Sequence, residues 1–178
     1  MLRDEDTRAA GSSRTRAERE ATAAMHAPEK IEPKGLSDYL AVMSRGVFEP
    51  GLNWQVVDSK WPGITEAFEG FDAYRVAGYT PGDEERLMAD ARIIRNRKKI
   101  EAVIHNAGEM LALDELPGGF AGYLRSKGSY QELVKDIRSR FHFIGESGAY
   151  HFLYTVGEPV PPWDDWMAAH PDFRAPRH

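Results

Sequence analysis

The sequence predicts an all-α protein built from many short helices. Apolar residues repeat at three- and four-residue intervals, most clearly in the stretch from Asn96 to Leu113. No stretch shows sustained alternation of apolar and polar residues between turn signals, so the sequence does not predict β-strands. Breaks such as Pro62-Gly63 and Pro117-Gly118-Gly119 divide the chain into short elements.

Residues 1–34 are predicted to form a disordered or partly helical tail. They contain no aromatic residue and are dominated by Arg, Glu, Asp, Ala, Ser and Thr. Such a segment buries too little apolar surface to offset the entropy lost on ordering. Residues 35–178 are predicted to form one helical domain, because 178 residues of which 42% are hydrophobic suit one domain plus an extension.

Capping signals set the expected helix boundaries. Ser37 is a suitable N-cap for a helix that Gly46 ends, and Pro62-Gly63 is expected to end the next helix. Thr80 followed by Pro81 combines an N-cap with proline at the first helical position. The expected helices are 39–45, 54–60, 64–69, 71–77, 81–90, 96–113, 120–125, 131–140 and 148–156.

Composition excludes several classes of site. The chain has no cysteine, and therefore no disulfide, no thiol nucleophile and no Cys-ligated metal. No pair among His105, His142 and His151 has i, i+4 spacing on one helix beside an acid, so neither a metal nor another cofactor is expected. There is no apolar run of roughly 20 residues and no secretory signal. We expect a cytoplasmic protein with no membrane partner.

Charge is distributed unevenly along the chain. The net charge of −5 counts mildly against a nucleic-acid partner, because phosphate binding depends on Lys and Arg. Residues 92–99, however, contain five basic residues and no acid, and distribution matters more than the total. A solvated helix face is the alternative interpretation of this basic stretch.

The segment from Phe141 to Gly157 is predicted to form a helix–hairpin–helix. Its apolar start leads into Gly145, and a helix from Gly148 to Val156 is closed by Gly157. Backbone N–H groups in such a turn, together with the following helix N-terminus, can hold an anion. In a DNA-binding protein that anion is a backbone phosphate. The alternative is an ordinary glycine turn between two packed helices.

Four stretches together carry the motifs of one protein family. They are Gly51 to Trp54, Ala67 to Asp72, Ile93 to Ala107 and Phe141 to Phe152. These stretches resemble the G-L-S-W, F-x-x-F-D, I-I-R-N-R-x-K-I-x-A-x-x-x-N-A and F-K-F-V-G-x-T-x-C-Y-x-F motifs of the DNA-3-methyladenine glycosylase I family. That family is a helical relative of the helix–hairpin–helix DNA glycosylases. The resemblance covers about residues 36–157 and implies a multi-helix glycosylase fold of this type.

The resemblance also implies an activity. The expected function is base-excision repair by a monofunctional DNA glycosylase, which flips an alkylated purine out of double-stranded DNA and hydrolyses its N-glycosidic bond. The protein is expected to act as a monomer. Two other functions stay open: a non-catalytic DNA-binding module of the same fold, and a glycosylase for a bulky adduct.

The chain departs from the family at two sites. Family members bind a structural zinc through an N-terminal Y-H-D-x-E-W-G motif and a C-terminal His and Cys. This chain has neither that motif nor a cysteine, so the zinc site is absent. The family also has a glutamate eight residues before the pocket tryptophan, where this chain has Gly46. Glu49, five residues before Trp54, is the nearest acid.

The expected site residues fall into three groups. Trp54 would stack on the base, with Phe48 and Tyr150 as further pocket walls, because an indole attracts an electron-poor or cationic base. Asp164, or its neighbour Asp165, would stabilise the sugar cation, and Glu49 is the other candidate acid. Asp164 could instead N-cap a final helix, 165–169. The expected phosphate contacts are the amides of Gly145, Ser147 and Gly148 and the side chains of Arg95, Arg97 and Lys99.

Overall fold

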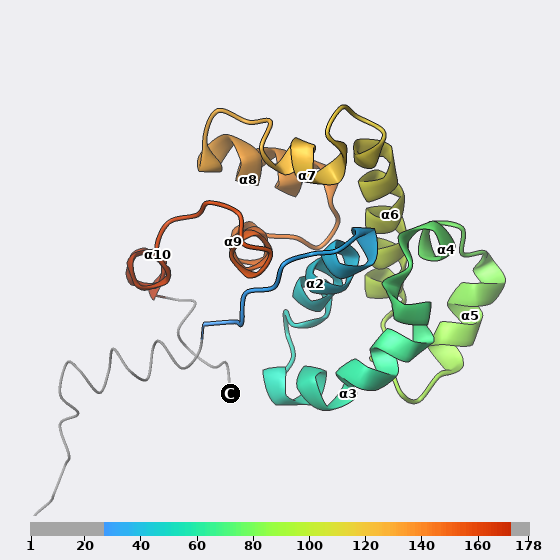
Figure 1. Cartoon of the computed structure of the whole chain (residues 1–178). Coiled ribbons are helices and arrows are strands. Elements are labelled where there is room, and N and C mark those ends of the chain that lie inside the picture. Colours follow the sequence, from blue (N-terminus) through green and yellow to red (C-terminus); the bar gives the residue numbers. More distant parts are fainter. Residues whose placement is uncertain (1–26, 172–178) are drawn as a thin grey trace, which may run out of the picture.

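The computed structural model describes residues 27–171, apart from the side chain of Trp54, and within them all regular secondary structure is helical (Figure 1). The all-α prediction is therefore confirmed. No helix in this part of the chain is long and apolar enough to cross a bilayer. The elements are α2 (Leu36–Phe48), α3 (Trp54–Ala67), the 3₁₀ helix η1 (Glu69–Phe71), α4 (Ala73–Ala77), α5 (Pro81–Ala89), α6 (Arg97–Asp114), α7 (Gly119–Leu124), α8 (Tyr130–Arg140), α9 (Glu146–Thr155) and α10 (Trp163–Ala169).

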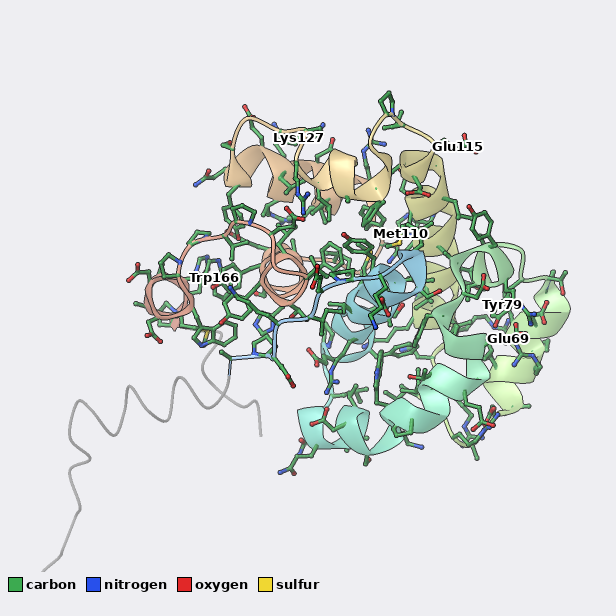
Figure 2. The ribbon with its side chains drawn as sticks, viewed as in Figure 1. Glu69, Tyr79, Met110, Glu115, Lys127 and Trp166 are labelled. Carbon is green, nitrogen blue, oxygen red and sulfur yellow. The ribbon has the colours of Figure 1, made fainter. Side chains whose placement is uncertain are left out.

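Helix α2 lies at the centre of the molecule. It packs against α6 on one side and α9 on the other, with α3 and η1 beyond its C-terminal end (Figure 1). Its fully buried residues include Leu40, Met43, Val47 and Phe48. Met110 projects from α6 into the same core (Figure 2). Helix α2 thus connects α3 and η1 to α6 and α9.

Of the two predicted N-caps, Thr80 is confirmed and Ser37 is wrong, because α2 begins at Leu36 with Gly35 at the N-cap position. The Thr80 side chain accepts a hydrogen bond from the Asp83 amide, the Asp83 side chain accepts one from the Thr80 amide, and Pro81 is the first helical residue. The Asn96 side chain accepts from the Lys99 amide and begins α6. Each cap satisfies amides that have no partner within the helix.

Two predicted helix ends were wrong. Helix α2 continues through Gly46 to Phe48, and α3 continues through Pro62 to Ala67. A glycine inside a helix costs about 1 kcal/mol and a proline about 3 kcal/mol. Burial offsets these costs, because Val47 and Phe48 follow the glycine and Ile64 follows the proline, all three fully buried.

The C-terminal helices enclose a second, aromatic cluster. Trp166 of α10 faces α9, where its ring stacks on Tyr150 with centroids 4.1 Å apart (Figure 2). Residues 27–34 run extended along this cluster, and the Ile31 amide donates to the Thr155 carbonyl at 2.8 Å. This segment was expected in the tail, and it instead lies against the domain. Residues 1–26 are outside the described part of the chain.

Candidate functional site

The loop between α2 and α3 carries the first part of the candidate site. Gly51 has φ +82°, a left-handed conformation that favours glycine, and the Leu52 amide donates to the Glu49 carbonyl at 3.1 Å. Asn53 then caps α3 by accepting a hydrogen bond from the Gln55 amide at 2.9 Å. Trp54 is the first residue of α3, and its side chain lies outside the described part of the structure. We name residues 49–53 the α2–α3 loop.

Glu49 lies at the start of this loop, within a small group of charges. Its carboxylate accepts a hydrogen bond from Arg45 Nε at 3.1 Å. Arg45 also forms an ion pair with Asp58 and lies over the Trp61 ring, 5.4 Å from its centroid. Two carboxylates thus share one guanidinium, and the Lys99 ammonium group on the Phe48 and Pro50 carbonyls balances the second carboxylate. The Glu49 side chain is 38% exposed, so its carboxylate is accessible to a cationic ligand.

Gly46 and Glu49 are three residues apart on α2, so they emerge on neighbouring parts of one helix face. The helix geometry extends through Glu49, whose amide donates to the Arg45 carbonyl at 3.0 Å. A Cβ on Gly46 would lie 3.8 Å from Ile144 Cδ1 and 3.9 Å from Gly148 Cα. The absent side chain therefore faces the start of α9, one helical turn from the Glu49 side chain.

Lys99 does not have the surroundings of a phosphate contact. Its side chain is only 6% exposed, and Nζ donates to the carbonyls of Phe48 at 2.9 Å and Pro50 at 2.7 Å. Burial lowers the pKa of the ammonium group. The sequence-based assignment fails because the basic stretch begins a helix, and α6 turns this residue inward against the end of α2.

Phe48 and Tyr150, the expected pocket walls, are both fully buried. The Phe48 ring packs edge-on against Phe68, with centroids 6.1 Å apart. Tyr150 belongs to the aromatic cluster with Trp166, and its hydroxyl donates to the Pro161 carbonyl at 3.0 Å. The two rings lie in separate clusters and contribute to packing, so in this conformation neither presents a face to a base.

The connection between α8 and α9 carries the second part of the candidate site. Residues 141–145 join the two helices, and Gly145 is the N-cap of α9. Helix α9 was expected from Gly148 but begins two residues earlier at Glu146, so Ser147 also lies in its first turn. The amides of Glu146, Ser147 and Gly148 have no partner within the helix. Phe143 has φ +59° and is 48% exposed, so the connection presents an aromatic ring to solvent.

Asn106 holds this connection against α6. Its side chain is 1% exposed, its Oδ1 accepts from the His142 amide at 2.7 Å, and its Nδ2 donates to the His142 carbonyl at 3.1 Å. The His142 ring stacks on His105, with centroids 3.6 Å apart, and burial together with His105 lowers the pKa of His142. Sequence reasoning gave Asn106 no role, although a lone asparagine on the apolar face of a helix was a usable signal.

The basic stretch supplies fewer free charges than its composition indicates. Arg97 forms ion pairs with Glu84 and Glu85 at 3.3 and 2.6 Å. Arg95 is exposed and has no ion-pair or hydrogen-bond partner within residues 27–171. Lys98 is likewise exposed and has no such partner in this range. Of the three expected side-chain phosphate contacts, only Arg95 is unpaired within this range.

Asp164 and Asp165 are exposed in the first turn of α10. Helix α10 begins two residues earlier than expected, with Pro162 at the N-cap position, so Asp164 is not the cap. Helices α9 and α10 run antiparallel. Trp163 at the start of α10 contacts Tyr154 near the end of α9, whereas His170 after the end of α10 approaches Glu146 at the start of α9. Gly46 of α2 lies beside the start of α9, since a Cβ added there would be 3.9 Å from Gly148 Cα. The structure therefore does not bring Asp164 and Glu49 to one site.

The residues described by the structure contain no group of three or more His, Cys, Asp or Glu side chains placed to hold a metal ion. His105 Nε2 donates a hydrogen bond to the Arg140 carbonyl, 2.9 Å away. His151 lies beside the Trp163 ring in the aromatic cluster, and burial lowers its pKa to about 4. These histidines contribute to packing between helices.

Comparison with known proteins identifies the family. The model of the methyladenine glycosylase family matches residues 36–140 of the chain. The chain belongs to the methyladenine glycosylase family. The matched region runs from α2 to the end of α8 and includes the α2–α3 loop, Lys99 and Asn106.

Individual relatives agree with this membership. The chain is 30% identical to DNA-3-methyladenine glycosylase 1 of Escherichia coli and 28% identical to the DNA-3-methyladenine glycosylase of Haemophilus influenzae. Both alignments span 130 residues and cover 61% of this chain and 70% of the relative.

Solved structures show the same fold. The 3-methyladenine DNA glycosylase I of Staphylococcus aureus, solved to explain 3-methyladenine recognition, superposes with a TM-score of 0.65 at 23% identity. That comparison covers 77% of this chain and 84% of the other. A second 3-methyladenine DNA glycosylase I structure gives a TM-score of 0.62 at 26% identity, covering 75% and 86% of the two chains.

Proposed function

We propose that this chain is a monofunctional DNA glycosylase that hydrolyses the N-glycosidic bond of alkylated purines in double-stranded DNA. The observation that carries the proposal is the family match over residues 36–140, which includes the loop between α2 and α3. The relatives are DNA-3-methyladenine glycosylases, so a 3-methyladenine-like base is the first substrate to test. We expect the protein to act as a monomer in the cytoplasm.

Cleavage of the N-glycosidic bond of an alkylated purine needs only modest catalytic assistance from the protein. An alkylated purine nucleotide is cationic, and its base is already a good leaving group. Once the nucleotide has been flipped out, the sugar passes through an oxocarbenium-like state while water attacks. The partly exposed Glu49 carboxylate would attract the cationic base and stabilise the positive charge on the sugar.

Hydrolysis is favoured over lyase chemistry by the placement of the lysines. A lyase needs an amine nucleophile that can form a Schiff base with the sugar. Lys99 is buried and donates to two backbone carbonyls, and no lysine follows Gly157 in the sequence. Water is therefore the proposed nucleophile, with Glu49 as the acid that orients it.

DNA would be held at the second part of the site. The amides at the start of α9 that have no partner within the helix, those of Ser147 and Gly148 among them, would bind a phosphate, and the exposed Arg95 would add a charged contact. Gly145 keeps this approach open because it has no side chain, and a Cβ added there would meet nothing within 4 Å. The proposed contacts position the duplex and do not read the base.

A second candidate function, excision of a bulkier adduct, is favoured by Gly46. The α2 face beside Ile144 and Gly148 carries no side chain at this position. The space one turn from Glu49 is therefore larger than it would be with any other residue. A purine with a larger substituent is therefore the second substrate class to test.

Base release from methylated duplex DNA tests the proposal. The wild type should release 3-methyladenine or 7-methylguanine, and Glu49→Gln should slow single-turnover release by about 100-fold or more. Asp165→Asn is the matched control, since this exposed carboxylate lies on α10. If Asp164→Asn abolished base release while Glu49→Gln released base normally, the catalytic carboxylate would be Asp164 on α10 and not Glu49.

The same assay separates the competing functions. No release by the wild type, with salt-dependent DNA binding intact, would favour the DNA-binding module. Release of a bulky adduct without release of methylated bases would favour the second candidate. Absence of both binding and release would overturn the glycosylase assignment.

A further inference from the structure

Lys99 is a buried charge whose polar partners are backbone carbonyls. Among the described residues, no carboxylate lies within ion-pair distance of Nζ, and its polar contacts are the two hydrogen bonds to Phe48 and Pro50. Burying an ammonium group costs several kcal/mol unless strong hydrogen bonds replace water. The position is also unfavourable for a cation, because it is in the first turn of α6, where the helix dipole is positive. A lysine in these surroundings needs a specific compensating interaction.

The two carbonyls supply that interaction. Phe48 is the last residue of α2, so its carbonyl lies at the negative end of the helix dipole and has no partner within the helix. Pro50 lies in the α2–α3 loop, where the proline supplies a carbonyl but no N–H. Hydrogen bonds that involve a charged group are stronger than neutral ones. Lys99 therefore links the start of α6 to the end of α2 and to the loop beyond it.

The two contacted carbonyls lie on either side of Glu49. Fixing Phe48 and Pro50 fixes the backbone of Glu49 between them and sets the starting point of the Gly51 turn. Within the described part of the chain, the Glu49 side chain is otherwise held by Arg45, itself about 40% exposed. The buried ammonium group is thus the contact that determines where the loop leaves the core.

We propose that Lys99 is a positioning residue for the excision reaction, holding the α2–α3 loop so that Glu49 and the start of α3 face the extruded base. The proposal rests on the proposed function and extends it, since Lys99 would touch neither the base nor the DNA. Lys99 was expected from the sequence to contact a DNA phosphate, and the proposal assigns it a structural role inside the core instead.

The test compares Lys99→Met with Lys60→Met. Methionine keeps much of the apolar stem and removes the ammonium group. Lys60 is the matched control, because its Nζ also donates to a backbone carbonyl, that of Ala91 at 3.0 Å, but away from the loop. Single-turnover base release and the Kd for methylated duplex DNA are measured for the wild type and both variants over a range of salt concentrations.

Lys99→Met should slow base release by about 100-fold, the effect of a displacement of roughly 1 Å in a catalytic group. Its Kd should stay within about twofold of the wild type, and its salt dependence should be unchanged. A phosphate contact would behave differently, because losing it would reduce the slope of log Kd against log salt by about 0.9. When the wild type is active, such a change in slope, or a release rate equal to that of Lys60→Met, would overturn the proposal.

Hydrogen exchange gives a measurement that does not depend on activity. The Leu52 amide, bonded to the Glu49 carbonyl, should exchange about tenfold faster in Lys99→Met, while the amides of α9 keep their wild-type rates. Unchanged exchange in the loop would contradict the positioning role even if the wild type released no base. An inactive wild type with faster loop exchange in the variant would remove the proposed function and leave the anchoring role standing.

Lys99→Arg covers the case in which the methionine variant does not fold. Arginine keeps the charge and can donate to both carbonyls. It should fold and release base within about tenfold of the wild-type rate, with slow exchange at Leu52. A folded Lys99→Arg with intact loop protection and a release rate as low as that of Glu49→Gln would overturn the proposal.

Discussion

Replacing Asn106 by leucine tests whether one buried amide holds the connection before α9. Leucine has a similar volume but can neither accept from the His142 amide nor donate to its carbonyl, bonds of 2.7 and 3.1 Å in the wild type. Each bond contributes about 1 kcal/mol net, so the pair contributes about 2 kcal/mol. The loss would approach about 4 kcal/mol if water could not replace the amide. The lower figure applies here because His142 is exposed.

Chemical denaturation and thermal unfolding measure this loss. For a chain of this size, about 2 kcal/mol corresponds to a decrease in Tm of roughly 4–8 °C. Hydrogen exchange should locate the effect, with the His142 amide losing its protection. If the connection also positions the α9 amides on DNA, the Kd for duplex DNA should rise while the rate of bound-state base release changes little.

Leu113→Ala is the control for a general loss of stability. Leu113 is a buried residue in the last turn of α6, and its truncation should cost about 2–5 kcal/mol. It should not expose the His142 amide selectively. The reasoning would be refuted if Asn106→Leu unfolded within about 0.5 kcal/mol of the wild type, or if both variants had the same effect on His142 exchange.

Three further predictions concern stability and DNA binding. Burial lowers the pKa of His151 to about 4, from an ordinary value of 6.5, so the unfolded state binds the proton first as the pH falls. The free energy of unfolding should therefore decrease by about 2 kcal/mol between pH 7.5 and pH 5, and His151→Phe should flatten that slope in denaturation curves. Gly63→Ala should destabilise by about 1–3 kcal/mol, because its Cβ would lie 2.9 Å from the Arg92 Cβ. Gly108→Ala, with nothing within 4 Å, should stabilise α6, and calorimetry would contradict this reasoning if both substitutions shifted Tm in the same direction. Arg97→Ala should leave the salt dependence of DNA binding unchanged, since its guanidinium pairs with carboxylates, and a change in slope would indicate a phosphate contact instead.

Local signals predicted much of the fold. The Thr80-Pro81 pair marks a helix start in both the sequence and the structure, because the cap bonds to an amide only a few residues away. The periodic stretch from Asn96 to Leu113 corresponds to α6, which ends one residue later at Asp114. Short-range bonds of this kind depend on the neighbouring sequence, so they are visible without the tertiary structure.

The errors arose where burial outweighed local preference. Gly46 and Pro62 are residue types that commonly end helices. Both nevertheless lie inside helices, because the helical residues that follow them are buried. Lys99 belongs to a basic stretch that is typical of an exposed surface. Its hydrogen-bond partners are nevertheless backbone carbonyls 49 and 51 residues away in the sequence. No short window contains the information that decides these cases.

The sequence by itself determined the helical class, the absence of thiol chemistry and the motifs shared with the methyladenine glycosylases, because these depend on composition and on spacing along the chain. Only the tertiary structure decided which charges are free and which are used internally. Arg95 stays exposed while Lys99, four residues later, is buried under the α2–α3 loop. The physical reason is that a side chain's role depends on the groups packed around it, and packing brings together segments that are far apart in the sequence.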